Sequence, residues 1–198
     1  MNPYLQNTEI IDWQDPLILS LAKELAKGLH LSSDIGKSCY DWVRDQISHS
    51  YDFKLGPVTC KASDVLKYGT GYCYAKSHLL AALLRANQVP TGFCYQRLRV
   101  GEKGGPFCLH GLNAVFLPEH GWYRVDPRGN KEGVDAQFNP PVERLAFPIT
   151  SKFEADLPEI WPQPLSVVVE VLTKYATYQD VYENLPDVSL ILQQRAGR

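Results

Sequence analysis

The sequence predicts an α+β fold in which a central helix that carries a cysteine packs against an antiparallel β-sheet. Helical patterns fill the first half of the chain, strand patterns follow from about residue 91, and a helical segment comes last. This segregated order favours an α+β architecture over alternating strand–helix–strand units. The segment from Cys73 to Ala86 is apolar almost all round, and a helix without a polar stripe belongs in the centre of a domain.

The helices before the central one are predicted from their caps and from the spacing of their apolar residues. Asp15 is a suitable N-cap, and Pro16 a suitable first residue, for an amphipathic helix. A second helix over about 32–47 has its apolar side chains on one face. Farther along, Ser63 is predicted to cap a short helix over 64–68.

Strands are predicted after the central helix, where short apolar segments are bounded by turn residues. Three segments fit this pattern: residues 91–100, 110–117 and 122–126. A glycine-rich loop over 101–106 and a tight turn over 118–121 connect them. A proline-rich, mostly irregular stretch covers 127–164, and a helical extension follows over about 165–185.

Length and composition restrict the class of protein. With 198 residues, the chain is predicted to form one domain over 1–198. Its 20 Lys+Arg and 22 Asp+Glu give a net charge of −2, so we expect no nucleic-acid partner and no membrane surface. The N-terminus has no secretory signal pattern, and no apolar run approaches the roughly 18 residues of a membrane span. We therefore expect a cytoplasmic protein whose five cysteines stay reduced.

Cys73 differs from the other cysteines because it follows Gly69-Thr70-Gly71-Tyr72 and opens the central helix. The positive end of the helix dipole lies there and favours a thiolate. Backbone N–H groups at the same helix end are placed to hold the oxyanion of an acyl intermediate. The two glycines allow a tight turn and leave space above the sulfur for a substrate. The alternative is a buried structural cysteine, with glycines that only end the preceding helix.

His110 and Asp126 are the candidate partners of Cys73. A nucleophilic cysteine needs a base, and the base needs an orienting group. If Leu117 pairs with Gly121 across a three-residue loop, His110 and Asp126 are diagonal neighbours on one face of the hairpin. A four-residue loop would put them on opposite faces. Each residue also has a plain structural interpretation, as a packed histidine and as a turn aspartate.

Four stretches of the sequence carry a family pattern: Tyr40–Arg44, Gly69–Cys73 with Leu79–Pro90, His110–Val115, and Gly121–Pro127. These stretches resemble the transglutaminase-like superfamily of papain-type cysteine enzymes. The resemblance covers about residues 36–128, which is roughly half of the chain. It implies a papain-like, transglutaminase-like core for the α+β fold.

The resemblance implies Cys73 as the nucleophile, His110 as general base and acid, and Asp126 as the group that holds the imidazole. Members of the superfamily include transglutaminases, peptide N-glycanases, peptidases and amidases, which pass through a thioester or acyl-thiol step. The implied function is a cysteine-dependent amide-bond hydrolase or acyl transferase, and we favour hydrolysis because no second acyl acceptor is evident. The implied substrate is a peptide, a protein or a small amide. No cofactor and no metal are implied, and the oligomeric state stays open.

The sequence departs from the family pattern beside these residues. Leu112 stands where an aromatic residue is usual, which puts in doubt any wall formed by that side chain. Gly111 replaces a small alanine. Arg128 follows Asp126-Pro127 in place of a threonine, and it either binds a substrate carboxylate or is solvated.

Two other functions stay open at this point. One is a non-catalytic binding module that keeps the fold and in which Cys73 is structural. The other is arylamine acetyltransferase-like acyl transfer, which uses the same order of triad residues. Cys108 offers a metal site as a further alternative, although no paired cysteine motif accompanies it. Cys39 and Cys94 are predicted to lie in the core, and Cys60 has no assigned role.

Overall fold

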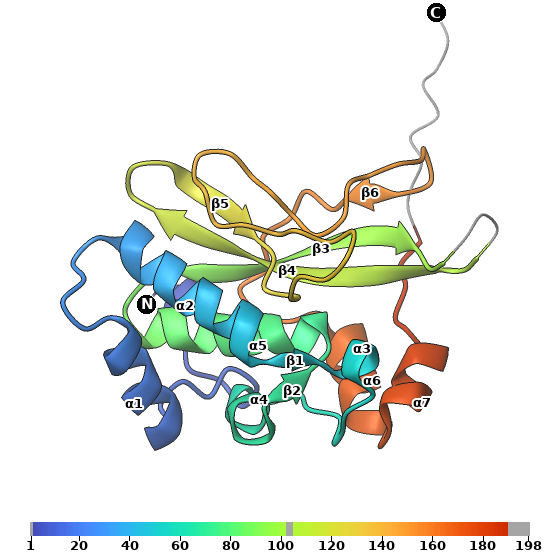
Figure 1. The fold of residues 1–198 in the computed structure, drawn as a ribbon, viewed down its shortest axis with the longest axis horizontal. Helices are drawn as coiled ribbons and strands as arrows, with labels where there is room; N and C mark the ends of the chain where they lie inside the picture. Colours follow the sequence, from blue (N-terminus) through green and yellow to red (C-terminus); the bar gives the residue numbers. More distant parts are fainter. Residues whose placement is uncertain (1, 102–104, 190–198) are drawn as a thin grey trace, which may run out of the picture.

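The central helix of the computed structural model, α5 (Cys73–Ala86), is enclosed by the rest of the chain, and every residue of it except the last is buried. A four-stranded sheet covers one side of α5 (Figure 1). Helices α1 (Pro16–Leu25), α2 (Ser32–Gln46) and α4 (Ala62–Tyr68) pack against its other sides. The predicted α+β class is therefore confirmed, with the cysteine-bearing helix packed on an antiparallel sheet.

The sheet is antiparallel throughout and has the strand order β5–β4–β3–β6. The strands β3 (Thr91–Arg99), β4 (Phe107–Leu117) and β5 (Gly121–Val125) match the three predicted segments, although β4 begins before the predicted residue 110, and each pairs with its sequence neighbour. The two-residue strand β6 (Ala155–Asp156) pairs with the other edge of β3 and comes from the stretch predicted to be mostly irregular.

The structure describes residues 2–101 and 105–189. The middle of the predicted glycine-rich loop over 101–106 therefore lies outside the described residues. Within the described ranges, no helix combines the length and the apolar character that crossing a membrane requires.

Two of the three predicted helix starts are correct, and for α1 the predicted cap is observed. The Asp15 carboxylate accepts a hydrogen bond from the backbone N–H of Leu17 at 2.8 Å, and so caps α1. The start of α2 also agrees with its prediction. The predicted Ser63 cap is wrong, because α4 already begins at Ala62. Asp12, far away in the sequence, accepts hydrogen bonds from the N–H (3.0 Å) and the hydroxyl of Ser63, so a distant contact replaces the local cap.

Two short parallel strands, β1 (Ser48–His49) and β2 (Thr70–Gly71), join segments that are far apart in the sequence. β1 follows α2 and leads into the single-turn helix α3 (Ser50–Phe53), whereas β2 leads into α5. The pairing places His49 beside Gly71, just before the cysteine-bearing helix.

The C-terminal helical extension consists of two short helices. α6 (Ser166–Lys174) and α7 (Tyr178–Glu183) are separated at Tyr175, whose backbone is extended (φ −103°, ψ 142°). Helix α7 packs against α3 (Figure 1). At the other end of the chain, a single 3-10 turn, η1 (Pro3–Leu5), contacts α5 and β3.

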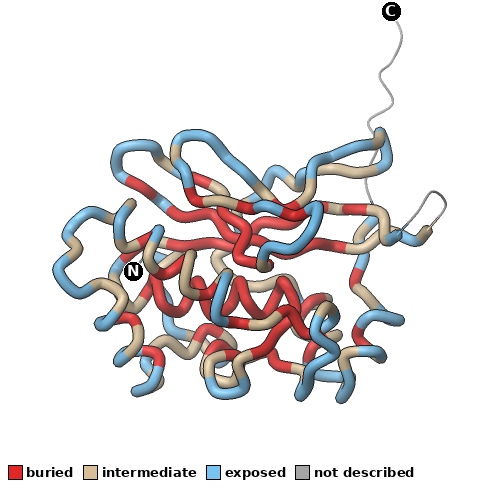
Figure 2. The backbone as a smooth tube through the Cα atoms, in the orientation of Figure 1, coloured by how far each residue is buried: buried red, intermediate tan, exposed pale blue. Residues whose placement is uncertain are grey.

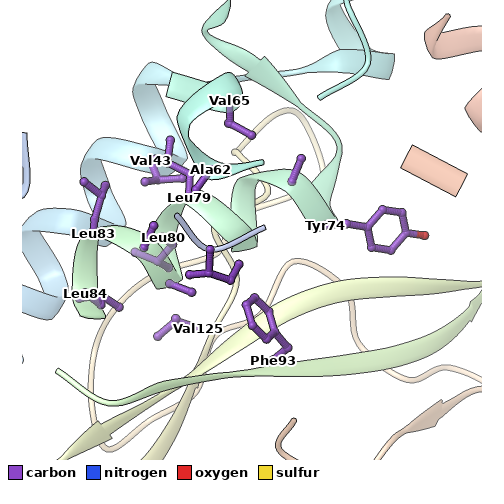
Figure 3. Packing of buried hydrophobic residues seen from close by; sticks show 14 of the residues in the cluster. Val43, Ala62, Val65, Tyr74, Leu79, Leu80, Leu83, Leu84, Phe93 and Val125 are labelled. Carbon is purple, nitrogen blue, oxygen red and sulfur yellow. The ribbon is translucent and has the colours of Figure 1, made fainter. Parts of the chain in front are cut away.

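Leucines of α5 form the centre of the hydrophobic core. Leu79, Leu80, Leu83 and Leu84 are fully buried between α2 and the sheet (Figure 3). Burial of each such side chain stabilises the fold by roughly 1.5–3 kcal/mol. The buried residues are concentrated in α5 and in the strands that cover it (Figure 2).

α5 also carries buried polar side chains that its apolar pattern hides. Arg85 is fully buried and donates hydrogen bonds to backbone carbonyls of three separate segments: Gln6 (2.9 Å), Thr91 (2.9 Å) and Pro162 (2.6 Å). His78 contacts the carbonyl oxygen of Cys60 at 2.7 Å. Because these groups have backbone partners, the helix tolerates complete enclosure although it is not wholly apolar.

The start of α5 approaches strand β4 closely at Gly111. A Cβ atom on Gly111 would lie 2.8 Å from Cδ1 of the Tyr74 ring and 3.3 Å from the Tyr74 Cα atom. Tyr74 is held in place, because its ring is buried and its hydroxyl donates a hydrogen bond to the Leu109 carbonyl. The absence of a side chain at Gly111 therefore lets the helix start lie directly on the strand that carries His110.

We predict that Gly111→Ala lowers the free energy of unfolding by about 1–3 kcal/mol, because the added methyl group overpacks the contact with Tyr74. Urea unfolding followed by circular dichroism measures the change. Gly56→Ala is the matched control, since a Cβ atom there would meet nothing within 4 Å. Equal stability of Gly111→Ala and the unsubstituted protein would contradict this account of the contact.

Candidate active site

Cys73 lies in the first turn of α5, where the chain leaves β2. Its side chain lines a cavity of about 290 Å³, and the residue is 6% exposed. The first N–H groups of a helix have no partner within the helix and carry the positive end of its dipole. This location therefore suits a thiolate, and also the oxyanion that forms when a thiolate attacks a carbonyl group.

The glycines that precede Cys73 serve the packing of the protein itself. Gly69 ends α4 with a left-handed backbone (φ 65°). A Cβ atom on Gly71 would lie 3.0 Å from the Cβ of Ala75 and 3.2 Å from Oγ1 of Thr59. The absence of a side chain at Gly71 therefore makes room for Ala75 and Thr59. The prediction that it also leaves space above the sulfur stays a prediction, and the cavity that Cys73 lines is adjacent.

His110 on β4 and Asp126, directly after β5, form a buried pair. Leu117 pairs with Gly121, which gives the three-residue loop that both residues need to share one face. His110 Nε2 lies 2.7 Å from Asp126 Oδ2, and the two side chains are 6% and 0% exposed. The structure therefore meets the geometric requirement that the hairpin imposes on this pair.

Further hydrogen bonds hold the Asp126 carboxylate in place. The backbone N–H groups of Arg128 and Ala146 donate to its two oxygens, each at 3.1 Å. Burial acts to raise the pKa of Asp126, but the charge and hydrogen bond of His110, together with these backbone donors, bring it below its ordinary value. The group is therefore a carboxylate at neutral pH.

The surroundings of His110 favour its protonated form. Burial acts to lower the pKa of His110, but the charges of Asp126 and Cys73 and the hydrogen bond with Asp126 raise it to about 10. Because Nε2 faces Asp126, Nδ1 is the nitrogen left for the sulfur of Cys73. An imidazolium beside sulfur stabilises a thiolate. The arrangement can thus supply a charged nucleophile and a proton donor within one cavity.

The other four cysteines have surroundings that keep them as thiols. Burial raises the pKa of Cys39, Cys60, Cys94 and Cys108 to about 12. The predicted core positions of Cys39 and Cys94 are confirmed. Cys108 lines the same cavity as Cys73. Within residues 2–101 and 105–189, however, no three His, Cys, Asp or Glu side chains gather as metal ligands would.

Aromatic side chains from distant segments line the cavity: Tyr51 in α3, Tyr72, Phe147, and Tyr182 in α7. The rings of Tyr51 and Tyr182 stack with their centroids 4.0 Å apart. The Tyr72 hydroxyl donates a hydrogen bond to the Tyr178 carbonyl at 2.5 Å. The C-terminal helix α7 is therefore part of the cavity wall, a location that no pattern in the sequence indicates.

The chain after α7 continues along the cavity. Leu185 lines it, and the Pro186 carbonyl accepts a hydrogen bond from the N–H of Leu109 on β4 at 2.7 Å. Asp187 then pairs with Arg97 of β3 through two hydrogen bonds of 2.7 Å. These contacts hold the C-terminal segment against the strand that carries His110.

Phe147, rather than residue 112, provides an aromatic neighbour for His110. The two rings meet edge to face, with centroids 5.0 Å apart and planes at 83°. Leu112 does not line the cavity and instead packs with Cys94 and Ala114. The sequence does not predict that Phe147 lies beside His110, because Phe147 belongs to the proline-rich stretch, where no periodic pattern distinguishes one residue from another.

Arg128 is neither solvated nor free. The residue is 7% exposed, and its Nη2 atom lies 2.8 Å from Oδ2 of Asp52, so the solvated alternative is wrong. Lys131 Nζ also lies 2.8 Å from Asp52. With the buried His49, these residues form a wall of the cavity that the sequence analysis did not predict.

A family model described as the transglutaminase-like superfamily matches residues 19–127, which is more than half of the chain. The chain belongs to this superfamily. The match includes Cys73, His110 and Asp126, and it extends beyond the stretches that carry the resemblance to take in most of α1. The transglutaminase-like superfamily is a family of cysteine-dependent enzymes, which agrees with the cavity chemistry described above.

Solved structures similar to this transglutaminase-like chain share little sequence with it. The "Putative Cysteine Protease" from Cytophaga hutchinsonii is 18% identical, with a TM-score of 0.49 over 64% of this chain and 41% of its own. The periplasmic domain of TgpA from Pseudomonas aeruginosa is 20% identical, with a TM-score of 0.48 over 63% of this chain and 45% of its own. The chain thus spans less than half the length of either structure. A comparison with curated proteins finds no match.

We predict that Asp126→Asn destabilises the protein near neutral pH by about 3–5 kcal/mol, because the buried His110 loses its carboxylate partner. The difference should shrink with rising pH. The raised pKa of His110 means that the stabilisation is fully present below about pH 6.5 and is lost as the pH passes about 10. Urea unfolding of both proteins across this range measures the effect.

Asp135→Asn is the control for this substitution, because it removes a carboxylate from an exposed pair with Arg144. Such a pair contributes at most about 1 kcal/mol. A stability difference for Asp126→Asn that does not change with pH would show that His110 is not charged in the folded protein.

Proposed function

We propose that this protein hydrolyses amide bonds through a thioester on Cys73, with His110 and Asp126 completing a catalytic triad. The observation that carries the proposal is the shared cavity, in which Cys73 at the start of α5 meets His110, itself bonded to buried Asp126 at 2.7 Å. Membership of the transglutaminase-like superfamily supports the same chemistry. The substrate would be a peptide, a protein or a small amide.

In the first half of the reaction, the Cys73 thiolate attacks the carbonyl carbon of the substrate, and an electron pair moves onto the carbonyl oxygen. Backbone N–H groups at the start of α5 stabilise this oxyanion. His110 then gives a proton to the amide nitrogen as the C–N bond breaks and the amine leaves. The products are a thioester on Cys73 and a neutral His110, whose ring Asp126 keeps oriented.

In the second half, water attacks the thioester carbonyl while His110 takes a proton from the water. The C–S bond breaks, the carboxylic acid leaves, and the thiolate and imidazolium are restored. An amine in place of water would give acyl transfer through the same steps. The direction therefore depends on which nucleophile reaches the thioester.

We predict that Cys73 reacts with iodoacetamide near pH 6 much faster than a free thiol, whose pKa is about 8.5. His110→Ala should slow this reaction at least about tenfold, because the thiolate loses its positive partner. Peptide mass spectrometry measures the rate at each cysteine, so the other four serve as internal references. His120→Ala is the matched control, because His120 lies in the turn between β4 and β5 and does not line the cavity.

A Cys73 that reacts as slowly as the buried Cys94 would contradict the proposal and favour a non-catalytic binding module. Hydrolysis is then measured on a library of peptides and small amides, with Cys73→Ala as the inactive reference. Protection of Cys73 from alkylation by acetyl-coenzyme A would instead indicate arylamine acetyltransferase-like acyl transfer.

A further inference from the structure

One wall of the cavity beside Cys73 carries more positive than negative charge. We call it the cationic wall, and it consists of His49, Asp52, Arg128 and Lys131. Among the described residues, Asp52 is the one acidic side chain that lines the cavity. Arg128 Nη2 and Lys131 Nζ each lie 2.8 Å from it. Two cations on one carboxylate leave one positive charge uncompensated.

His49 adds an unpartnered polar atom to the cationic wall. The residue is 7% exposed, and its buried Nδ1 atom has no hydrogen-bond partner among the described residues. The distance of 3.6 Å to the Asp52 carboxylate is too long for a hydrogen bond. Burial and the charge of Arg128 lower the pKa of His49 to about 3, so the ring is neutral. It offers hydrogen bonding without changing the charge of the wall.

A further cation lies behind the wall. Lys76 is fully buried, and its Nζ atom donates hydrogen bonds to the backbone carbonyls of Arg44 (3.1 Å) and Ile47. These partners are backbone carbonyls and carry no net negative charge. Burial and the charge of Arg128 lower the pKa of Lys76 to about 7, so it is partly charged at neutral pH. Lys76 therefore adds to the excess of positive charge instead of offsetting it.

The position of the cationic wall makes this charge accessible to a substrate. Its four residues line both the cavity of about 290 Å³ that contains Cys73 and a second cavity of about 390 Å³. The first volume is at the lower end of the range for ligand sites, so a group that enters beside Cys73 meets the wall at short range. Guanidinium and ammonium groups are the usual protein partners of carboxylates.

We propose that the cationic wall binds a carboxylate of the acyl donor, so that the preferred substrates are acidic amides with a free carboxylate near the bond that is cleaved. This inference rests on the function proposed above. Lys131 is the residue able to turn toward the substrate, because its side chain is 48% exposed and Asp52 is its partner among the described residues. Arg128 is buried and stays with Asp52.

Iodoacetate and iodoacetamide test this inference, because they have nearly the same size and differ in one carboxylate charge. We define the charge ratio as the alkylation rate with iodoacetate divided by the rate with iodoacetamide. We expect this ratio to be higher at Cys73 than for N-acetylcysteine. Lys131→Gln should lower the ratio roughly fivefold and Lys131→Glu should lower it further, since positive charge is lost at short range. Asp52→Asn should raise it. An ionic strength of about 0.02 M limits screening.

Lys27→Gln is the matched control, because it removes an exposed lysine that lies after α1 and outside the cavity. Circular dichroism checks the fold of every variant. If Lys131→Gln slowed both reagents equally, the wall would act on the thiolate and not on a substrate anion, and the inference would be wrong while the proposed function stands. An unchanged ratio in both Lys131 variants would overturn it as well. If neither reagent reacted at Cys73, the proposed function would fail and this inference with it.

Discussion

The close contact between the start of α5 and strand β4 is the constraint on which the rest of the site depends. Gly111 has no side chain, so Tyr74 packs directly over it and the helix start reaches the strand that carries His110. The amide of Asn113 donates a hydrogen bond to the Ser77 carbonyl at 3.0 Å and ties the next turn of α5 to the same strand. Because reacting groups must be placed to within about an ångström, a looser contact here would separate sulfur from imidazole.

Two charged clusters lie beside the cavity, and they differ in how far their charges are compensated within the protein. In the pair of His110 and Asp126, each charge has its partner inside the protein, and backbone N–H groups donate a hydrogen bond to each of the two carboxylate oxygens. Such a pair holds a ring and a proton in place. The cationic wall has an excess of positive charge, because Arg128 and Lys131 share the single carboxylate of Asp52. A cluster with an uncompensated positive charge attracts an anion from outside the protein.

The central helix and the pair of His110 and Asp126 can be predicted from the sequence because their signals are local. The helix follows from its apolar composition, and the pair requires only that one hairpin loop has three residues, which it has. The cap of α4 cannot be predicted in this way, because Asp12 reaches it from a distant segment. The burial of Arg85 is also hidden, since the carbonyls that accept its hydrogen bonds come from three separate parts of the chain.

By itself, the sequence determined the α+β class, the superfamily and the three candidate catalytic residues, because motifs and hydrophobic periodicity record the preferences of neighbouring residues. Only the tertiary structure decided what surrounds them. Phe147 reaches His110 from an irregular stretch, and Arg128 meets Asp52 across a long sequence separation. The charge and the shape of a cavity depend on burial and on which distant side chains come together. These are properties of the folded chain, and no local pattern carries them.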